Sequence, residues 1–556
     1  MAYLLMCSYE KHALYCGDQP VGPHRDTPAS GAIITVPTDQ PTIQAAVTAA
    51  VAGDTIKIES GVYFENVTVP AGKDGLQILG TNADTTIVDA RPLAPTGTGP
   101  GFTISSNNVT IAKLTVRHAE FDPSFTIPGD GVRCVAAGCT LQDLHLISNG
   151  GNGADIDGNN AVVMDSFISG NASEGLLLVN GDNAQILKNV AQNQEKGGFI
   201  LTGSNMRIEG NTANVIEDNE GFRVTGNNNM ILKNSSSITD GEGFEVDGNS
   251  NIISGNEVLT AEEDGINVIG ALNTVTGNSV QGAANECYEL TGNDPVIENN
   301  SAESCGEDGF RISGNNPVVE KNKAAFILGG GGFDIEGSNP QVIGNRAEFM
   351  EDDGFQITCN TDCTGLLVQR NTAMGAADDD EGFDIFVAGG TGAGWIVEQN
   401  TAMDNVSDGF EITGSGGIIR RNKALRNGNE TEHGFDLDGD NNEISFNQAF
   451  SNQGDGFEIN GSNNTISKNK ADKNLLDGIH LTFGDLNTVS ANSAAKNQAD
   501  GIRNDSTNTT LTNNKAGGNQ TDCTSNFLVG ATVAVDTGNK CADGSSFSLT
   551  QTDRIH

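Results

Sequence analysis

Acidic side chains recur at fixed positions around a repeated glycine. One acid directly precedes this glycine in most repeats, and another often stands two residues after it. Carboxylates stacked in columns repel each other by about 1 kcal/mol per neighbouring pair even in water, unless cations gather between them. The acids before the glycine are Asp130, Glu174, Glu220, Glu242, Asp264, Glu286, Asp308, Asp353, Glu381, Asp408, Asp455, Asp477 and Asp500. Those after it are Asp155, Glu245, Glu289, Asp334, Asp384, Glu411, Asp436 and Glu458.

We expect a calcium site where both columns are acidic in successive repeats, because calcium prefers oxygen ligands. The alternative interpretation is a solubilising acidic surface or an adaptation to high salt. The predicted calcium ligands are Asp353, Glu381, Asp384, Asp408 and Glu411.

A histidine interrupts the first column, where His433 precedes Gly434. It would place a proton-transfer group among carboxylates, which is what general acid-base catalysis requires. Together with Asp384 and Glu411, His433 forms the candidate catalytic set. The alternative is an ordinary surface histidine.

The repeat lengthens in one region, and a break in regularity is where we look for function. Gly354, Gly382, Gly409 and Gly434 are 28, 27 and 25 residues apart, whereas most repeats are 22 or 23 residues long. The extra residues predict loops that border the strand after the glycine. Trp395 ends one insertion, and we expect it to be exposed so that a sugar ring stacks on it; the alternative is a plug for its own loop. The predicted substrate-binding residues are Trp395, Gln356, Asp384, Glu411 and Asp436.

The repeat itself predicts the structure that positions these side chains. After the glycine, apolar and polar residues alternate, as in "GFEVDG" and "GFDIEG", which is the period of a strand with one buried face. The residue after the glycine is usually Phe, so these rings should stack inside. An asparagine column, from Asn189 to Asn514, predicts a ladder of side-chain amides between coils about 4.8 Å apart. We therefore expect an all-β parallel β-helix of about 19 coils.

The opening "ITVPTDQPTIQAAVTAAVAGDTIKIESGVYFENVTV", residues 34–69, resembles the start of right-handed parallel β-helix proteins of the pectin-lyase-like superfamily. The resemblance implies that "PTIQAAVTAAVAG" forms a helix that caps the first coil. In polysaccharide enzymes of this superfamily the cleft lies over the face of the first strand. The expected organisation is a poorly structured segment 1–32, a capped β-helix 33–522 and a C-terminal cap or tail 523–556.

Composition limits the partners. With 73 acidic against 30 basic residues the net charge is −43, which excludes a broad surface for nucleic acid or anionic membranes. No apolar run is long enough to insert into a membrane. Neighbouring cysteines predict local disulfides and an extracellular or envelope location, although a signal peptide is not evident. Reduced cysteines in a cytosolic solenoid are the alternative. The expected pairs are Cys7 with Cys16, Cys134 with Cys139, Cys287 with Cys305, Cys359 with Cys363, and Cys523 with Cys541.

These observations favour an extracellular protein that binds a polysaccharide or cell-surface glycan along the first-strand face, with calcium as a possible cofactor. If it is an enzyme, we expect a polysaccharide lyase or a glycoside hydrolase. The alternative is a structural stalk or adhesin without catalysis, which the monotony of the other repeats favours. A copper-site accessory protein is disfavoured because the sequence has no suitable Met or His cluster.

Overall fold

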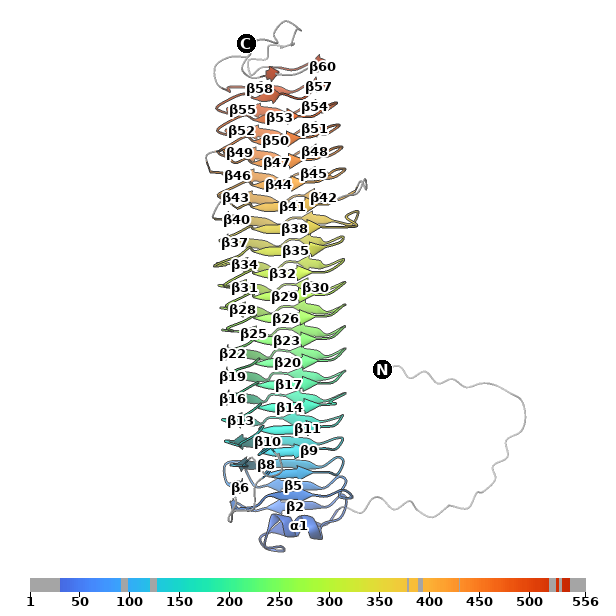
Figure 1. Cartoon of the computed structure of the whole chain (residues 1–556), viewed down its shortest axis with the longest axis vertical. Coiled ribbons are helices and arrows are strands. Elements are labelled where there is room, and N and C mark those ends of the chain that lie inside the picture. The colour runs from blue at the N-terminus through green and yellow to red at the C-terminus, as the bar shows by residue number, and fades with distance from the viewer. Residues whose placement is uncertain are drawn as a thin grey trace, which may run out of the picture.

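The chain forms one elongated solenoid in which each turn contributes up to three short parallel strands (Figure 1). The computed structural model describes residues 31–91, 99–120, 128–377, 380–388, 394–429, 431–519, 527–529 and 533–540. The predicted right-handed parallel β-helix is confirmed, with about 21 turns where about 19 were expected. Among the described residues, no helix is long and apolar enough to cross a membrane.

The first ladder faces the viewer in Figure 1 and consists of the strands that follow the repeated glycine. Its members pair in parallel from one coil to the next, for example β41 with β44 and β44 with β47. Its strands are β4 Val67–Val69, β7 Phe102–Ile104, β9 Val132–Cys134, β11 Ala154–Asp157, β14 Leu176–Val179, β17 Phe199–Thr202, β20 Phe222–Thr225, β23 Phe244–Asp247, β26 Ile266–Ile269, β29 Tyr288–Thr291, β32 Phe310–Ser313, β35 Phe333–Gly337, β38 Phe355–Cys359, β41 Phe383–Val387, β44 Phe410–Thr413, β47 Phe435–Asp438, β50 Phe457–Asn460, β53 Ile479–Phe483, β56 Ile502–Asn504 and β59 Phe527–Val529.

The second ladder runs along another side of the solenoid and includes the first and last described strands of the chain. Its strands are β1 Ile33–Val36, β2 Thr55–Ile58, β5 Gln77–Gly80, β8 Thr110–Arg117, β10 Thr140–Ile147, β12 Val162–Met164, β15 Gln185–Leu187, β18 Arg207–Glu209, β21 Met230–Leu232, β24 Ile252–Ser254, β27 Thr274–Thr276, β30 Val296–Glu298, β33 Val318–Glu320, β36 Gln341–Ile343, β39 Leu367–Gln369, β42 Ile396–Glu398, β45 Ile418–Arg420, β48 Glu443–Ser445, β51 Thr465–Ser467, β54 Thr488–Ser490, β57 Thr509–Thr512 and β60 Val533–Thr537.

The third ladder completes each turn, and β8 and β10 are long enough to run through both the second and third ladders. Its other strands are β3 Gly61–Tyr63, β6 Thr86–Asp89, β13 Phe167–Ser169, β16 Val190–Gln194, β19 Thr212–Ile216, β22 Ser235–Thr239, β25 Glu257–Val258, β28 Ser279–Gln281, β31 Ser301–Glu303, β34 Lys323–Ala325, β37 Arg346–Met350, β40 Thr372–Ala376, β43 Thr401–Met403, β46 Lys423–Leu425, β49 Gln448–Phe450, β52 Lys470–Asp472, β55 Ser493–Ala495 and β58 Lys515–Gly517.

The predicted helix α1, Ile43–Ala49, covers the open N-terminal end of the stack. Thr42 caps it by accepting the N–H of Ala45, and the carboxylate of Glu65 accepts two further N–H groups of the first turn. Its buried face packs on β1, β2 and β4. The helix therefore removes apolar surface that the first coil would otherwise expose.

The interior consists of ladders of identical side chains, as the repeat predicted. The Phe rings after the glycine stack from coil to coil, with Phe383 and Phe410 centred 4.7 Å apart. The predicted asparagine ladder is also present: the Nδ2 of Asn234, for example, donates to Oδ1 of Asn256 over 3.1 Å. These contacts satisfy buried amides without water and hold successive coils in register.

Three of the expected disulfides form, namely Cys134–Cys139, Cys287–Cys305 and Cys359–Cys363. The other two expected pairs lie outside the described residues, as do almost all of the predicted N-terminal segment 1–32 and much of segment 523–556. Strands β59 and β60 show that the first and second ladders continue beyond residue 522.

Candidate active site on the first-strand face

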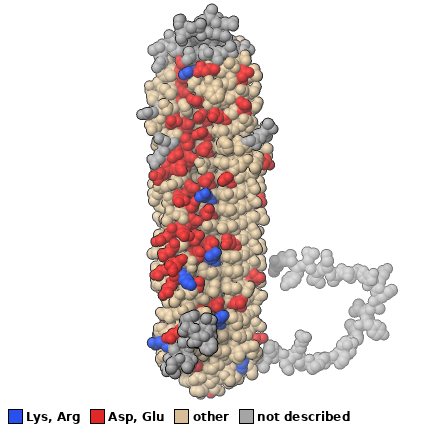
Figure 2. Space-filling model, viewed as in Figure 1, with Lys and Arg blue, Asp and Glu red and all other residues tan. Residues whose placement is uncertain are grey.

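The second residue of the first-ladder strands from β4 to β56 points outward, and parallel pairing places these residues in one file. Asp384 pairs with Glu411, which pairs with Asp436 in the next coil. We call this file the outward column. Figure 2 shows the Asp and Glu side chains gathered into a stripe along this face. In its C-terminal half the outward column consists of Asp334, Gln356, Asp384, Glu411, Asp436, Glu458, His480 and Arg503.

The residues directly before the glycine form a second file, the turn column, and most of them have a structural task. Each of several carboxylates accepts the backbone N–H of the equivalent residue one coil further on, as Asp353 does from Glu381 over 2.8 Å. This bond satisfies a turn amide that the strands leave unpaired. Bonds of this kind also run from Asn152 to Asp130, Glu286 to Asp264, Gly331 to Asp308, His433 to Asp408, Asp477 to Asp455 and Asp500 to Asp477.

Burial and crowding make several of these acids hard to ionise. Burial, reinforced by Asp436 and other neighbouring carboxylates, raises the pKa of Asp408 to about 8. The same two causes raise the pKa of Asp436 to about 7 and that of Asp384 to about 6. The pKa of Asp353 is also raised, first by burial and then by Glu381. At neutral pH the stripe therefore contains proton donors as well as carboxylates.

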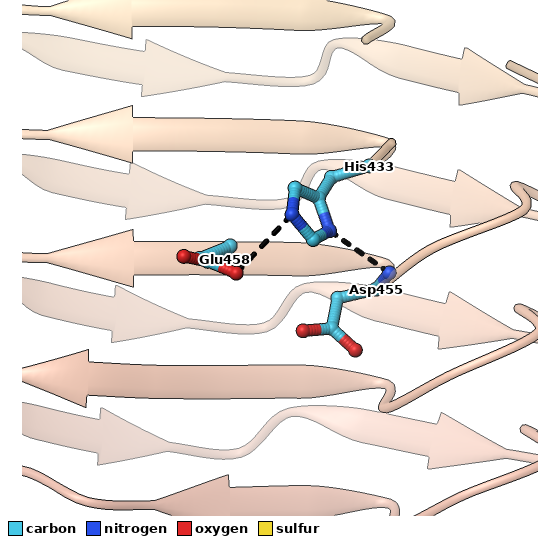
Figure 3. A group of neighbouring side chains, drawn as sticks. All are labelled: His433, Asp455 and Glu458. Atoms are coloured by element: carbon cyan, nitrogen blue, oxygen red, sulfur yellow. Dashed lines mark hydrogen bonds and ion pairs between the residues drawn. The ribbon is translucent and has the colours of Figure 1, made fainter. Parts of the chain in front are cut away.

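His433 takes over the structural task of the acids it replaces. Its Nδ1 accepts the backbone N–H of Asp455 over 3.0 Å, so this nitrogen carries no proton. The ring proton must then sit on Nε2, which lies 3.2 Å from Oε2 of Glu458 (Figure 3). The fold thus fixes both the tautomer of His433 and the direction in which it donates.

His480, in the outward column, is bound differently. Its Nδ1 lies 3.1 Å from Oδ2 of Asp455, and its Nε2 lies 3.1 Å from Oδ2 of Asp505. Burial acts to lower the pKa of His480, but the two carboxylates outweigh it and raise the pKa. Arg503, one coil further on, adds a second cation through its 2.9 Å contact with Asp505.

These groups surround a pocket of about 380 Å³ over β50 and β53, which we call the His433 pocket. Its wall combines two histidines with carboxylates of different pKa, since burial and Asp477 raise the pKa of Asp500 to about 6. The lining residues are Thr431, Glu432, His433, Asp455, Glu458, Leu476, Asp477, His480, Ala499, Asp500 and Arg503.

In the described part of the chain, three groups of side chains bring their potential ligand atoms within 4.8 Å of one another. Two include His433 or His480, but the Nε2 proton of His433 opposes a metal at the first, and both ring nitrogens of His480 already contact carboxylates at the second. The third consists of Asp352, Asp353 and Asp380, and its all-oxygen donor set fits calcium. Of the five predicted calcium ligands only Asp353 belongs to it.

The structure places the other predicted site residues unevenly. Gln356, Asp384, Glu411 and Asp436 all lie in the outward column, as expected, but upstream of the pocket. His433 joins the pocket, and Asp384 and Glu411 do not line it. The inserted residues 378–379, 389–393 and 430 lie outside the described part of the chain.

The prediction that Trp395 is exposed for sugar binding is wrong. Its side chain is 1% exposed, and its Nε1 donates to the carbonyl of Ser415 over 3.0 Å. The indole occupies space beside Gly417, where a Cβ would come within 2.2 Å of the ring. Trp395 therefore fills space in the interior, which agrees with the alternative interpretation that it acts as a plug. Its place in the coil belongs to a second buried asparagine ladder, which includes Asn442, Asn464 and Asn487.

Sequence reasoning missed His480 and Arg503 as functional candidates. The signal was present, because both stand two residues after the glycine, at positions where acids dominate the neighbouring coils. Asp455 and Glu458 were noted only as members of acidic columns. Their association with His433 follows from coil stacking and not from their separation along the chain.

Comparison with known proteins supports the architecture. The family model described as "Right handed beta helix region" matches residues 129–280, 264–427 and 418–547. No curated protein matches the sequence. Similar solved structures include ORF18 of Geobacillus virus E2, with 13% identity over 53% of this chain and 58% of the viral chain and a TM-score of 0.36.

Two further similar structures are enzymes. The A-module of the mannuronan C-5 epimerase AlgE4 of Azotobacter vinelandii is 16% identical over 65% of this chain and 97% of its own, with a TM-score of 0.32. The catalytic unit of the GH87 alpha-1,3-glucanase of Streptomyces thermodiastaticus is 15% identical over 62% and 69%, with a TM-score of 0.37. Likeness at this level says nothing about activity. The family model, however, matches more than half of the sequence, and the protein therefore belongs to the right-handed β-helix family.

Proposed function

We propose that the protein binds a neutral polysaccharide along the first-strand face and hydrolyses it at the His433 pocket. The observation that carries this proposal is the pairing of His433 with Glu458 in a pocket that also contains carboxyl groups of raised pKa. Glycoside hydrolysis requires one carboxylic acid that gives a proton and one carboxylate that accepts one.

The roles follow from the environment of each group. Asp500, whose pKa of about 6 keeps a fraction protonated near neutral pH, gives its proton to the glycosidic oxygen as the bond to the anomeric carbon breaks. The carboxylate of Glu458 takes a proton from the water that attacks that carbon. The Nε2–H of His433 holds this carboxylate in place.

Charge selects the class of substrate. The two cations of the pocket, His480 and Arg503, already contact Asp455, Asp477 and Asp505. An anionic polysaccharide would therefore meet uncompensated carboxylates, whereas sugar hydroxyls can donate to them. An anionic glycan would need a bridging cation, and calcium at Asp352, Asp353 and Asp380 is the place we propose for it. The local disulfides accord with a secreted or surface-bound protein.

The second candidate function is that of a structural stalk. It is favoured by the turn column, in which acids accept backbone N–H groups and so serve the fold. If the protein is only a stalk, it has no catalytic activity, and replacing Glu458 changes none.

To test the proposal, the full chain is incubated with neutral glucans, mannans, galactans and xylans, and with polygalacturonate and alginate, each with and without calcium. Release of reducing ends without unsaturated products supports hydrolysis, whereas reducing ends together with unsaturated products would indicate a lyase. We expect Glu458→Gln and Asp500→Asn to lower kcat at least about 100-fold. Glu289→Gln, in the same column but far from the pocket, is the matched control and should not change it. Absence of binding and turnover on every polymer would leave the stalk.

A further inference from the structure

Two phenylalanines stand exposed at the corner between the third and first ladders. Phe326 and Phe349 are 50% and 49% exposed, and their rings stack with centroids 5.3 Å apart and planes 16° from parallel. Phe326 follows β34 directly, and Phe349 lies in β37 of the next coil. The neighbouring Leu328 is 64% exposed. This apolar surface lies beside the acidic first-strand face.

The fold does not need aromatic residues at these positions. Both residues adopt left-handed backbone conformations, with φ of 55° and 59°, which are energetically unfavourable for a bulky side chain. Most other coils place small or polar residues at this position, such as Ser304 and Gly375, and the apolar residues found there, Val215 and Ile238, are not aromatic. Because half of each ring remains in water, burial within the monomer offsets little of that cost.

The approach to these rings from the first-strand face is open. Residues 329–332 are four consecutive glycines, so the chain bears no side chain between Leu328 and β35. On the far side of Phe349 the next coil has Gly375, whose backbone alone lies against the ring. Exposed carboxylates of Glu307 and Glu351 flank this bare stretch.

We propose that Phe326 and Phe349 form a remote sugar-binding subsite, on which the apolar face of a pyranose ring of a neutral polysaccharide packs. This inference rests on the proposed function. Aromatic rings next to hydrogen-bond acceptors match a ring that has C–H groups on its faces and hydroxyls at its edge. The flanking carboxylates would oppose an anionic glycan or an acidic protein.

The subsite and the His433 pocket lie on the same corner of the solenoid. Phe349 precedes Gly354 and His433 precedes Gly434, and the two glycines are three coils apart through Gly382 and Gly409. At about 4.8 Å per coil the separation along the axis is roughly 14 Å. A polysaccharide chain that follows the acidic stripe would therefore reach both places, whereas a short oligosaccharide in the pocket would not reach the rings.

Calorimetry measures the affinity of the wild type and of each variant for the neutral polysaccharide that the wild type binds best. The same measurement is made with its oligosaccharides of increasing length. The variant is Phe326→Asn with Phe349→Asn, because asparagine tolerates the left-handed conformation. The matched control is Phe446→Asn, which removes another exposed ring of φ 59° from the corner between the second and third ladders.

We expect the double variant to bind the polymer about tenfold more weakly, to bind the shortest oligosaccharides normally and to melt at the same or a higher temperature. The control should bind both normally. Unchanged affinity for the polymer would overturn the subsite while leaving the proposed function intact. A wild type that binds no glycan would overturn both, and a wild-type dimer that the double variant dissociates would assign the rings to self-association instead.

Discussion

Two neighbouring stretches of the outward column occupy equivalent strand positions but differ in how the repulsion between stacked carboxylates is balanced. In the upstream stretch, Asp384, Glu411 and Asp436 follow one another, and none of them forms a salt bridge within the described part of the chain. In the downstream stretch, Glu458 is followed by His480 and Arg503. Parallel stacking creates the same crowding in both stretches. Only the downstream stretch carries its own counter-charges.

The difference is visible in the titration of the groups. Burial and neighbouring acids raise the pKa values of all three upstream residues, and Oδ1 of Asp436 is buried without a hydrogen-bond partner among the described residues. Downstream, the carboxylates of Asp455 and Asp505 instead raise the pKa of His480. A repeat therefore fixes where side chains lie, while substitutions within a column decide whether protons, external cations or basic side chains balance the charge.

The largest expected effect is an inverted pH dependence of stability. A carboxyl group whose pKa is higher in the folded state stabilises the fold fully below its unfolded pKa, and this contribution is lost as the pH rises through the folded value. For Asp384, Asp436 and Asp408 the loss should extend from about pH 4 to pH 8. His480, with its raised pKa, acts in the same direction.

We therefore expect a melting temperature several degrees higher at pH 5 than at pH 8 in low salt, measured by calorimetry. High salt should reduce the difference by screening the ionised acids. A protein that melts at a higher temperature at pH 8 would contradict the assignment of raised pKa values to the upstream stretch.

The next effect concerns the cation of the downstream stretch. His480→Gln should lower the free energy of local opening of the C-terminal coils by about 2 kcal/mol at pH 6, because it leaves Asp455, which is 3% exposed, without its charged partner. Hydrogen exchange of β50 and β53 amides measures this change. Once the pH rises above the raised pKa of His480, the wild type and the variant should differ less. Equal protection at pH 6 would show that His480 does not stabilise these coils.

The architecture could be predicted from the sequence because successive coils repeat the same pattern of residues. The Phe after the glycine, the column from Asn189 to Asn514 and the capping helix all lie where predicted. The coil count was low because the described coils before β9 lack the regular glycine spacing. Such features depend only on the spacing and polarity of residues within one repeat, and both can be seen directly in the sequence.

The site was harder to predict from the sequence because its contacts join residues of different coils. The tautomer of His433 depends on the backbone N–H of Asp455, and the charge of His480 depends on Asp505. The error at Trp395 arose because positions occupied by Asn, Pro and Gly suggested an exposed turn, whereas the asparagines there form a buried ladder. The pocket also lies downstream of the irregular spacing that directed attention to Asp384 and Glu411.

A smaller effect should come from removing one charge of the upstream stretch. Asp436→Asn eliminates repulsion with Glu411 and Glu458, so it should stabilise the protein by about 1 kcal/mol at pH 8 and have no effect at pH 5, where the acid is already protonated. Glu303→Gln, an exposed acid on the third ladder, is the control and should change nothing. Chemical denaturation at both pH values measures the difference. Destabilisation by Asp436→Asn at pH 8 would mean that this carboxylate has a favourable partner.

The smallest expected effect separates bound calcium from simple screening. Strands hold the upstream acids one coil apart, so the folded state concentrates negative charge that the unfolded chain can spread, and cations should bind the folded state preferentially. With calcium at a concentration equal to its dissociation constant, one site adds about 0.4 kcal/mol to stability. Calcium should therefore raise the melting temperature more than sodium at equal ionic strength. If Asp384 and Glu411 contribute ligands, Asp384→Asn with Glu411→Gln should abolish that excess, and Asp353→Asn should do so if the site is centred on Asp352, Asp353 and Asp380. Equal responses to calcium and sodium in the wild type would reduce the upstream stretch to a screened acidic surface, and the contrast with the downstream stretch would then rest on His480 and Arg503 alone.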